Sequence, residues 1–258
     1  MLNKNELILD RVRALSARDL ETGKVLFRLT TLEDSKLQTT AEGDEVTDAV
    51  GALITKLYRA KKAVFSATNS LISLNLLAAQ YGTEKEVADT GAEIIVPTYD
   101  ILTVDTSGTV TLLNTPVEDI KYIYALTNNE ISDTYELAVG TVDATHFTMT
   151  DNVITVPTGL KGKVYVEYDY KSTSAMKVSN KVNKFPEACS ILIDAIFKDK
   201  CNENTVYAGK ILAEKAKLNP EQVETALTST GKHPFEFTIL SGYCDGEDAE
   251  LFSVILAE

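Results

Sequence analysis

The sequence predicts a mainly β protein of the α+β class with one clear helix. Its strongest signal is strand-like alternation, in which apolar side chains recur at every second position. Short clusters of glycine, asparagine and aspartate separate these segments and are typical of tight turns. One stretch, residues 70–82, has helical character instead. The alternating segments are residues 25–29, 164–170, 235–239 and 252–256, and the turn clusters are residues 106–108, 127–129, 151–152 and 245–246.

The predicted helix follows Ser70, a good N-cap, and ends at Gly82, where a C-terminal glycine belongs. A second, shorter helix is predicted at residues 219–222, with Asn219 as its cap. Residues 208–217 fit a strand or a helix equally well. The apolar stripe of the first helix comprises Leu71, Leu74, Leu77, Ala78 and Tyr81.

The length and composition of the chain fit a globular fold with a substantial hydrophobic core. The chain has 258 residues, of which 44% are hydrophobic and 24% charged, as is usual for folded proteins. Its middle, residues 95–172, is almost purely strand and turn, whereas the flanking parts carry the helix candidates. We therefore predict one domain built from residues 1–94 and 173–258, and a β-rich insert at residues 95–172.

The charge of the chain is strongly acidic, with a formal net charge of −13. A protein that grips nucleic-acid phosphates needs a basic surface, so this charge disfavours a backbone-binding role. The first residues lack the apolar core of a secretory signal, and no apolar run approaches the roughly 20 residues needed to cross a bilayer. We expect a protein that is made and kept in a cytoplasm, without a membrane partner.

The sequence contains no recognisable catalytic or metal-binding motif. Phosphate-loop, dinucleotide, nucleophile-elbow and zinc-protease patterns are all missing, so we expect no enzymatic activity, no cofactor and no metal. Three widely spaced cysteines fit neither disulfides nor zinc, and Cys189 is interpreted as a core residue. His146 and His233 are interpreted as turn or surface histidines.

Three charged segments are predicted to lie in solvent. The acidic residues 42–48 and 245–250 are interpreted as loops that do not follow the ligand order of calcium sites. The basic residues 59–62 are placed at a hairpin turn between residues 53–58 and 63–68, where charge protects a sheet edge. If such loops face one another between subunits, the acidic segment 42–48 and the basic segment 59–62 are natural partners.

The order of these features is itself informative. A predicted strand pair through residues 21–24 precedes the segment 29–42, the hairpin 53–69 and the helix 70–82. This order resembles that of a bacteriophage tail tube (major tail) protein. The likeness continues through residues 147–157, 162–169, 184–187, 207–211 and 231–237.

The resemblance implies a tail-tube-like β-sandwich with a flanking helix and long hairpins. In that family six subunits join their hairpins into an inner β-barrel, and the rings stack into a hollow tube that conducts DNA. The implied partners are further copies of the chain, tail proteins such as a sheath, a terminator or a baseplate, and viral DNA that passes without specific binding. The implied location is the virion tail, assembled in the cytoplasm of the bacterial host.

The resemblance also implies where subunits meet. Its basic hairpin residues are a departure, because the lumens of such tubes tend to be acidic. The ring-forming hairpin is expected to use Leu53, Lys56, Tyr58, Arg59, Lys61, Lys62, Val64 and Phe65, and the ring-stacking loop Glu42, Asp44, Glu45 and Asp48.

Two other classes of protein fit the same acidic, site-poor composition. The first is another phage virion structural protein, such as a head-decoration, head–tail connector or baseplate component. The second is a carbohydrate- or surface-binding β module, which is disfavoured because the chain contains no tryptophan. An assay of the assembly product distinguishes the first class from a tube.

Overall fold

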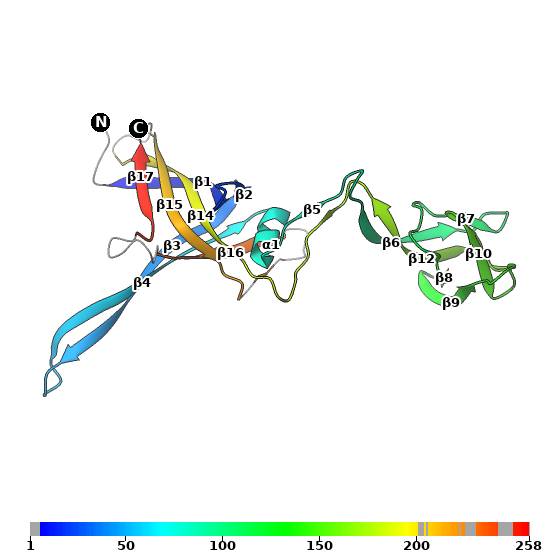
Figure 1. Ribbon diagram of the computed structural model, residues 1–258, viewed down its shortest axis with the longest axis horizontal. Coiled ribbons are helices and arrows are strands. Elements are labelled where there is room, and N and C mark those ends of the chain that lie inside the picture. The colour runs from blue at the N-terminus through cyan, green and yellow to red at the C-terminus, as the bar shows by residue number, and fades with distance from the viewer. Residues whose placement is uncertain are drawn as a thin grey trace. The chain divides into compact units, whose positions relative to one another are not determined.

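The computed structural model describes residues 6–200, 204, 206–221, 223–224, 231–241 and 250–257. The chain forms two compact units (Figure 1). The main unit comprises Met1–Lys85 and Val178–Glu258, and the insert unit comprises Glu86–Lys177. The insert unit therefore begins nine residues before the predicted boundary at residue 95 and ends five residues after the one at residue 172. Most of the acidic segment 245–250, together with Cys201 and Cys244, lies outside the described residues.

The main unit is built on one antiparallel sheet. Its strands follow the order β2-β1-β14-β15-β16-β4-β3, and β17 pairs separately with β15. Residues 208–217 thus belong to a strand. The bounds are β1 Leu7–Asp19, β2 Val25–Leu29, β3 Leu32–Thr47, β4 Leu53–Asn69, β14 Ala188–Asp199, β15 Val206–Leu218, β16 His233–Ile239 and β17 Ser253–Ala257.

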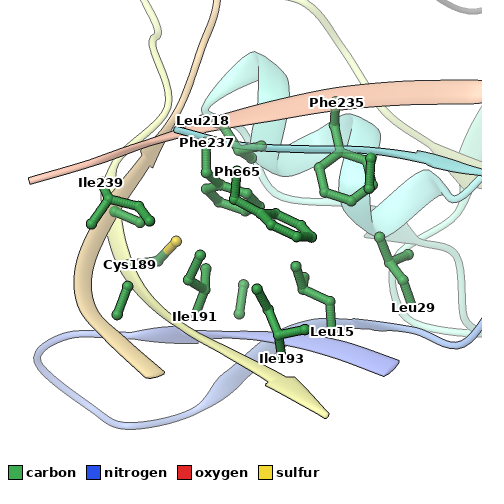
Figure 2. Close-up of a cluster of buried hydrophobic side chains, with 14 of the residues drawn as sticks. Leu15, Leu29, Phe65, Cys189, Ile191, Ile193, Leu218, Phe235, Phe237 and Ile239 are labelled. Carbon is green, nitrogen blue, oxygen red and sulfur yellow. The ribbon is translucent and has the colours of Figure 1, made fainter. Parts of the chain in front are cut away.

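The core of the main unit lies inside this sheet, which rolls over until it is nearly a closed barrel. Phe27 on β2 stacks on Phe237 on β16 with ring centroids 6.4 Å apart, although three strands lie between β2 and β16 in the sheet order. Figure 2 shows aliphatic and aromatic side chains from all sides meeting in this interior. The prediction of a mainly β protein is confirmed. One strongly curled sheet encloses the core by itself, and the expected tail-tube-like β-sandwich stays a prediction.

Cys189 belongs to this core, as predicted. Its side chain is 3% exposed and packs among isoleucine and phenylalanine side chains (Figure 2). Burial raises the pKa of the Cys189 thiol to about 12, because the thiolate would lose its hydration. The thiol is therefore protonated at neutral pH and serves as a small apolar group.

Helix α1, Leu74–Tyr81, ends at Gly82 as predicted but begins later than expected. Its N-cap is Ser73, whose hydroxyl accepts a hydrogen bond from the Leu76 N–H at 3.3 Å. Ser70 is used differently, because its hydroxyl donates to the Thr31 carbonyl at 3.1 Å. The helix buries Leu76 in the core, whereas the side chains of Leu71 and Leu74 are exposed. The predicted apolar stripe through Leu71 and Leu74 is therefore wrong.

The predicted helix at residues 219–222 is absent from the described residues 219–221, and Gln222 lies outside them. Asn219 caps a turn instead. Its side-chain oxygen accepts a hydrogen bond from the Glu221 N–H at 3.0 Å, and its amide donates to Glu236 at 3.1 Å. The same asparagine chemistry that caps a helix also closes a turn, which explains the error.

The insert unit has its own sheet and its own core. The sheet order is β6-β12-β8-β9-β10-β11-β7, and β5 pairs with β13 apart from it. The predicted turns are confirmed: Gly108, Asn128, Asn129 and Asp151 all have positive φ, which glycine, asparagine and aspartate tolerate best. The bounds are β5 Glu86–Val87, β6 Ile94–Thr103, β7 Thr109–Thr111, β8 Tyr122–Thr127, β9 Glu130–Leu137, β10 His146–Thr150, β11 Val153–Thr155, β12 Lys163–Ser172 and β13 Met176–Lys177.

His146 is the first residue of β10 in the insert unit, and its side chain is partly exposed at the surface. Its Nδ1 atom is 2.8 Å from the Asp143 carboxylate, and both side chains are substantially exposed. Hydrogen bonds from Thr145 and His146 hold the pKa of Asp143 at about 2. The histidine and the aspartate therefore stabilise a surface turn.

Candidate functional site

The main unit carries a long two-stranded arm, defined as residues 40–62, at the distal ends of β3 and β4. Every residue of the arm is exposed, whereas the strand residues that follow, Ala63–Asn69, alternate between buried and half-buried positions. Strand β16 pairs with β4 only from Ala63 onward. The arm therefore extends by itself away from the sheet, over roughly 30 Å at the usual rise of a strand (Figure 1).

The structure corrects the predicted turn at residues 59–62. Strand β4 runs through this segment without a break, and the hairpin turns at residues 48–52. Ala60 is an unpaired bulge residue with φ 53°, because Lys61 pairs with Ala41 and Arg59 with the next residue along β3. The acidic segment 42–48 is therefore strand up to residue 47 and not a loop.

The tip of the arm is a tight turn held by Asp48. Its carboxylate accepts hydrogen bonds from the backbone N–H groups of Val50 at 3.0 Å and Ala52 at 2.8 Å. Gly51 adopts φ 84°, which glycine allows at little cost. Asp48, predicted to contact a stacked ring, is thus engaged in shaping its own turn.

Acidic and basic residues of the arm pair with one another inside one chain. Lys62 contacts Glu42 at 2.8 Å, Lys56 contacts Glu45 at 3.2 Å, and Arg59 pairs with Asp44. The hydrogen bond from Lys62 lowers the pKa of Glu42. The arm holds four acidic and four basic residues and is neutral overall, in a chain of net charge −13. The proposed partnership between segments 42–48 and 59–62 therefore exists within a subunit.

Strand register places the predicted hairpin residues on two faces of the arm. The pairs Leu53–Thr47, Lys56–Glu45, Tyr58–Gly43 and Lys61–Ala41 continue the face that points into the core. Arg59 and Lys62 lie on the opposite face together with Leu57, because the extra residue at the Ala60 bulge shifts the alternation by one position. The Tyr58 ring covers Gly43, where an added Cβ would lie 3.2 Å from the ring.

Two predicted hairpin residues lie outside the arm. Phe65 is 2% exposed and packs against Phe235 in the core, with ring centroids 6.4 Å apart. Val64 is half-buried on the other face of the same strand. Phe65 is therefore a core residue and is not available for a contact between subunits.

The arm leaves large apolar side chains in solvent. Six of them have exposed fractions between 38% and 88%. An isolated two-stranded hairpin is marginally stable in water, and a long exposed edge with apolar residues invites pairing with another chain. The arm thus has the properties of a surface that is covered by a partner. The six residues are Val46, Val50, Leu53, Ile54, Leu57 and Tyr58.

Strand β16 begins with a buried histidine that the sequence interpretation placed on the surface. His233 is fully buried and pairs across the sheet with Asn69 of β4. Its Nδ1 atom accepts a hydrogen bond from the Ser73 N–H at 3.4 Å, and its Nε2 atom lies 2.6 Å from Gln80 Oε1. The sequence contains a pattern that predicts this burial, since His233, Phe235 and Phe237 alternate with other residues and so lie on one face of the strand.

We expect the stability of the main unit to fall as the pH drops below about 6.5. Burial lowers the pKa of His233, so between the unfolded-state value near 6.5 and the lower native value only the unfolded chain binds the proton. The free energy of unfolding then decreases with a limiting slope of about 1.4 kcal/mol per pH unit. Denaturant titrations between pH 7.5 and 5 measure this slope. His233→Gln should flatten it and His146→Gln should keep it; the reverse pattern would contradict the assignment.

Among the described residues, no group of three or more histidine, cysteine, aspartate or glutamate side chains could hold a metal ion. Nor is any helix in the described part of the chain long and apolar enough to cross a membrane.

Fold and arm together define a class: a mainly β protein with a projecting, charge-balanced hairpin that leaves apolar surface uncovered. A family model described as the YomU/Tube protein family matches residues 7–254. The chain belongs to this family, which is associated with phages. This membership supports the conclusion that the chain is a phage tube-like protein and a virion component. No curated protein matches the chain.

Proposed function

We propose that the protein is a structural, non-enzymatic subunit of a phage tail tube. Its copies would assemble into hexameric rings that stack, and the lumen of the stack would conduct DNA during ejection. The observation that carries this proposal is the arm, whose two strands are exposed along their whole length. Membership of the YomU/Tube family supports the same role.

Unpaired backbone groups along the arm favour pairing with neighbouring subunits. Among the residues that the structure describes, β3 pairs in the arm with β4 alone, and β16 pairs with β4 only below the arm. Both long edges of the arm therefore present unpaired N–H and C=O groups. Arms from neighbouring subunits that pair side by side would satisfy these groups, and closing the ring would remove every edge.

The charge pattern of the arm suits a channel through which DNA passes. Lys56, Arg59 and Lys62 are each paired with a carboxylate of the same arm. Lys61 is the one arm cation without an ion pair in the described residues. The arm thus lacks the row of free cations that holds phosphates by releasing counterions, and the acidic remainder of the chain repels DNA.

The other implied partners follow from the same assembly. A sheath would bind the outside of the tube, and a terminator or a baseplate its ends. The proposed location is the virion tail, and assembly would take place in the cytoplasm of the host.

The proposal is tested by negative-stain electron microscopy of the purified full chain at increasing concentration. Hollow rings that stack into tubes are the expected product, and their symmetry can be counted in end-on views. Discrete closed oligomers that never stack would overturn the proposal and favour a head-decoration, head–tail connector or baseplate component.

A further inference from the structure

The insert unit contains an open groove of about 680 Å³ on the solvent face of β6, β12 and β8. This volume lies within the range of sites that bind small ligands or side chains. Strand β6 forms one wall and is the edge strand of its sheet, since in the described part of the chain it pairs with β12 alone. The groove belongs to one unit, so its shape does not depend on the arm.

Tyrosines from three neighbouring strands gather at this groove. Tyr165 on β12 lies between Tyr99 on β6 and Tyr124 on β8, with ring centroids 5.3 and 6.0 Å away. Tyr99 and Tyr124 line the groove together with Tyr122. Tyr99 is 59% exposed and Tyr122 is 46% exposed, although buried tyrosine contributes more to stability than exposed tyrosine does. The core of the insert unit therefore does not account for these rings.

The groove is also strongly negative. Glu118, Asp119, Glu167 and Asp169 line it, and Lys121 is the only cationic side chain among the described lining residues, which gives them a net charge of −3. None of the four carboxylates forms an ion pair within the part of the chain that the structure describes. Glu167 accepts a hydrogen bond from the Tyr165 hydroxyl, which raises the pKa of Tyr165 to about 12 and keeps the phenol neutral.

We propose that this groove binds an organic cation, and that its occupant is a lysine or arginine side chain on an extended segment of a partner protein. Aromatic faces attract ammonium and guanidinium groups, and a carboxylate beside the ring adds a charge-assisted hydrogen bond. The free edge of β6 offers backbone groups to an extended segment, so its alternate side chains would reach the rings. The same charge disfavours nucleic acid and acidic peptides.

The proposal is tested with the purified full chain and a fluorescent octapeptide that alternates arginine and threonine. Fluorescence anisotropy should show binding of this peptide and not of a peptide with glutamine in place of arginine. Removing two carboxylates with Glu167→Gln and Asp169→Asn should weaken binding roughly tenfold, since each lost charge-assisted contact matters. The neutral side chains keep the shape and the hydrogen-bonding oxygens, so the fold is preserved.

Matched variants separate the groove from the overall charge of the protein. Asp133→Asn and Asp151→Asn remove the same charge from exposed positions outside the groove, and this pair should change binding less than about twofold. Tyr99→Phe should keep binding and Tyr99→Ala should weaken it roughly fivefold, because the ring is what attracts the cation.

Three results would overturn the proposal. The first is equal weakening by the groove pair and the control pair, which would indicate long-range charge alone. The second is no binding of the arginine peptide. The third is a protein that binds a neutral oligosaccharide but not the arginine peptide. If Tyr99→Ala abolished the binding of the oligosaccharide, the groove would be a saccharide site.

Discussion

Gly82→Ala is expected to lower the free energy of unfolding by about 3 kcal/mol. Gly82 ends helix α1 with φ 64°, a conformation that costs alanine about 1 kcal/mol. An added Cβ would also lie 2.1 Å from the carbonyl oxygen and 2.3 Å from the carbonyl carbon of Phe185. Backbone atoms cannot swing aside as a side chain can, so overpacking adds about 2 kcal/mol. Denaturant unfolding of the two proteins measures the difference.

Gly23→Ala is the matched control for this prediction. Gly23 lies in the same unit and has φ 68°, but no described residue lies within 4 Å of an added Cβ. This variant should lose only the backbone contribution of about 1 kcal/mol. Equal losses in the two variants would show that the approach of residue 185 to the helix end costs nothing, contrary to our argument.

Leu57→Asp is expected to raise the concentration needed for assembly while leaving the subunit folded. The Leu57 side chain is 55% exposed in the isolated chain, so its replacement should change the free energy of unfolding by less than about 0.5 kcal/mol. If neighbouring arms cover it, the lost burial amounts to about 1.5–3 kcal/mol per subunit. The concentration needed for assembly should then rise at least about tenfold. Sedimentation and electron microscopy at matched concentrations measure this threshold.

Ile131→Asp provides the control for the arm variant. Ile131 lies on β9 of the insert unit and is 57% exposed, close to the value for Leu57. It introduces the same charge on a similarly exposed aliphatic residue outside the arm and should assemble as the natural sequence does. Normal assembly of Leu57→Asp would refute the role of the arm, and a failure of both variants would point to charge alone.

Local patterns in the sequence predicted local structure well. Alternation located strands in both units, and the turn clusters ending at Gly108 and at residues 129 and 152 contain the positive-φ residues. The C-terminal end of helix α1 was predictable because Gly82 alone tolerates its backbone conformation there. The N-terminal end was not, because Ser70 and Ser73 are equally good caps and a contact with Thr31 decides between them.

The strand pairing of the arm could not be predicted from local sequence patterns. Three cations within residues 59–62 are typical of a hairpin tip, yet a single bulge at Ala60 carries the strand straight through them. A bulge cannot be recognised from the amino-acid composition of a segment. The arm follows from the strand register, which pairs residues 42–45 with residues 56–59. Residues 42–47 are therefore a strand and not the expected loop.

The sequence by itself determined the class of fold, the helix end at Gly82 and the acidic character of the chain, since these depend on neighbouring residues or on composition. The tertiary structure alone decided that one curled sheet encloses the core, that Phe65 packs inside it, and that the charges of the arm neutralise one another. The physical reason is the same in each case. Strand pairing joins residues far apart in the chain, and a shift of one residue moves a side chain to the opposite face.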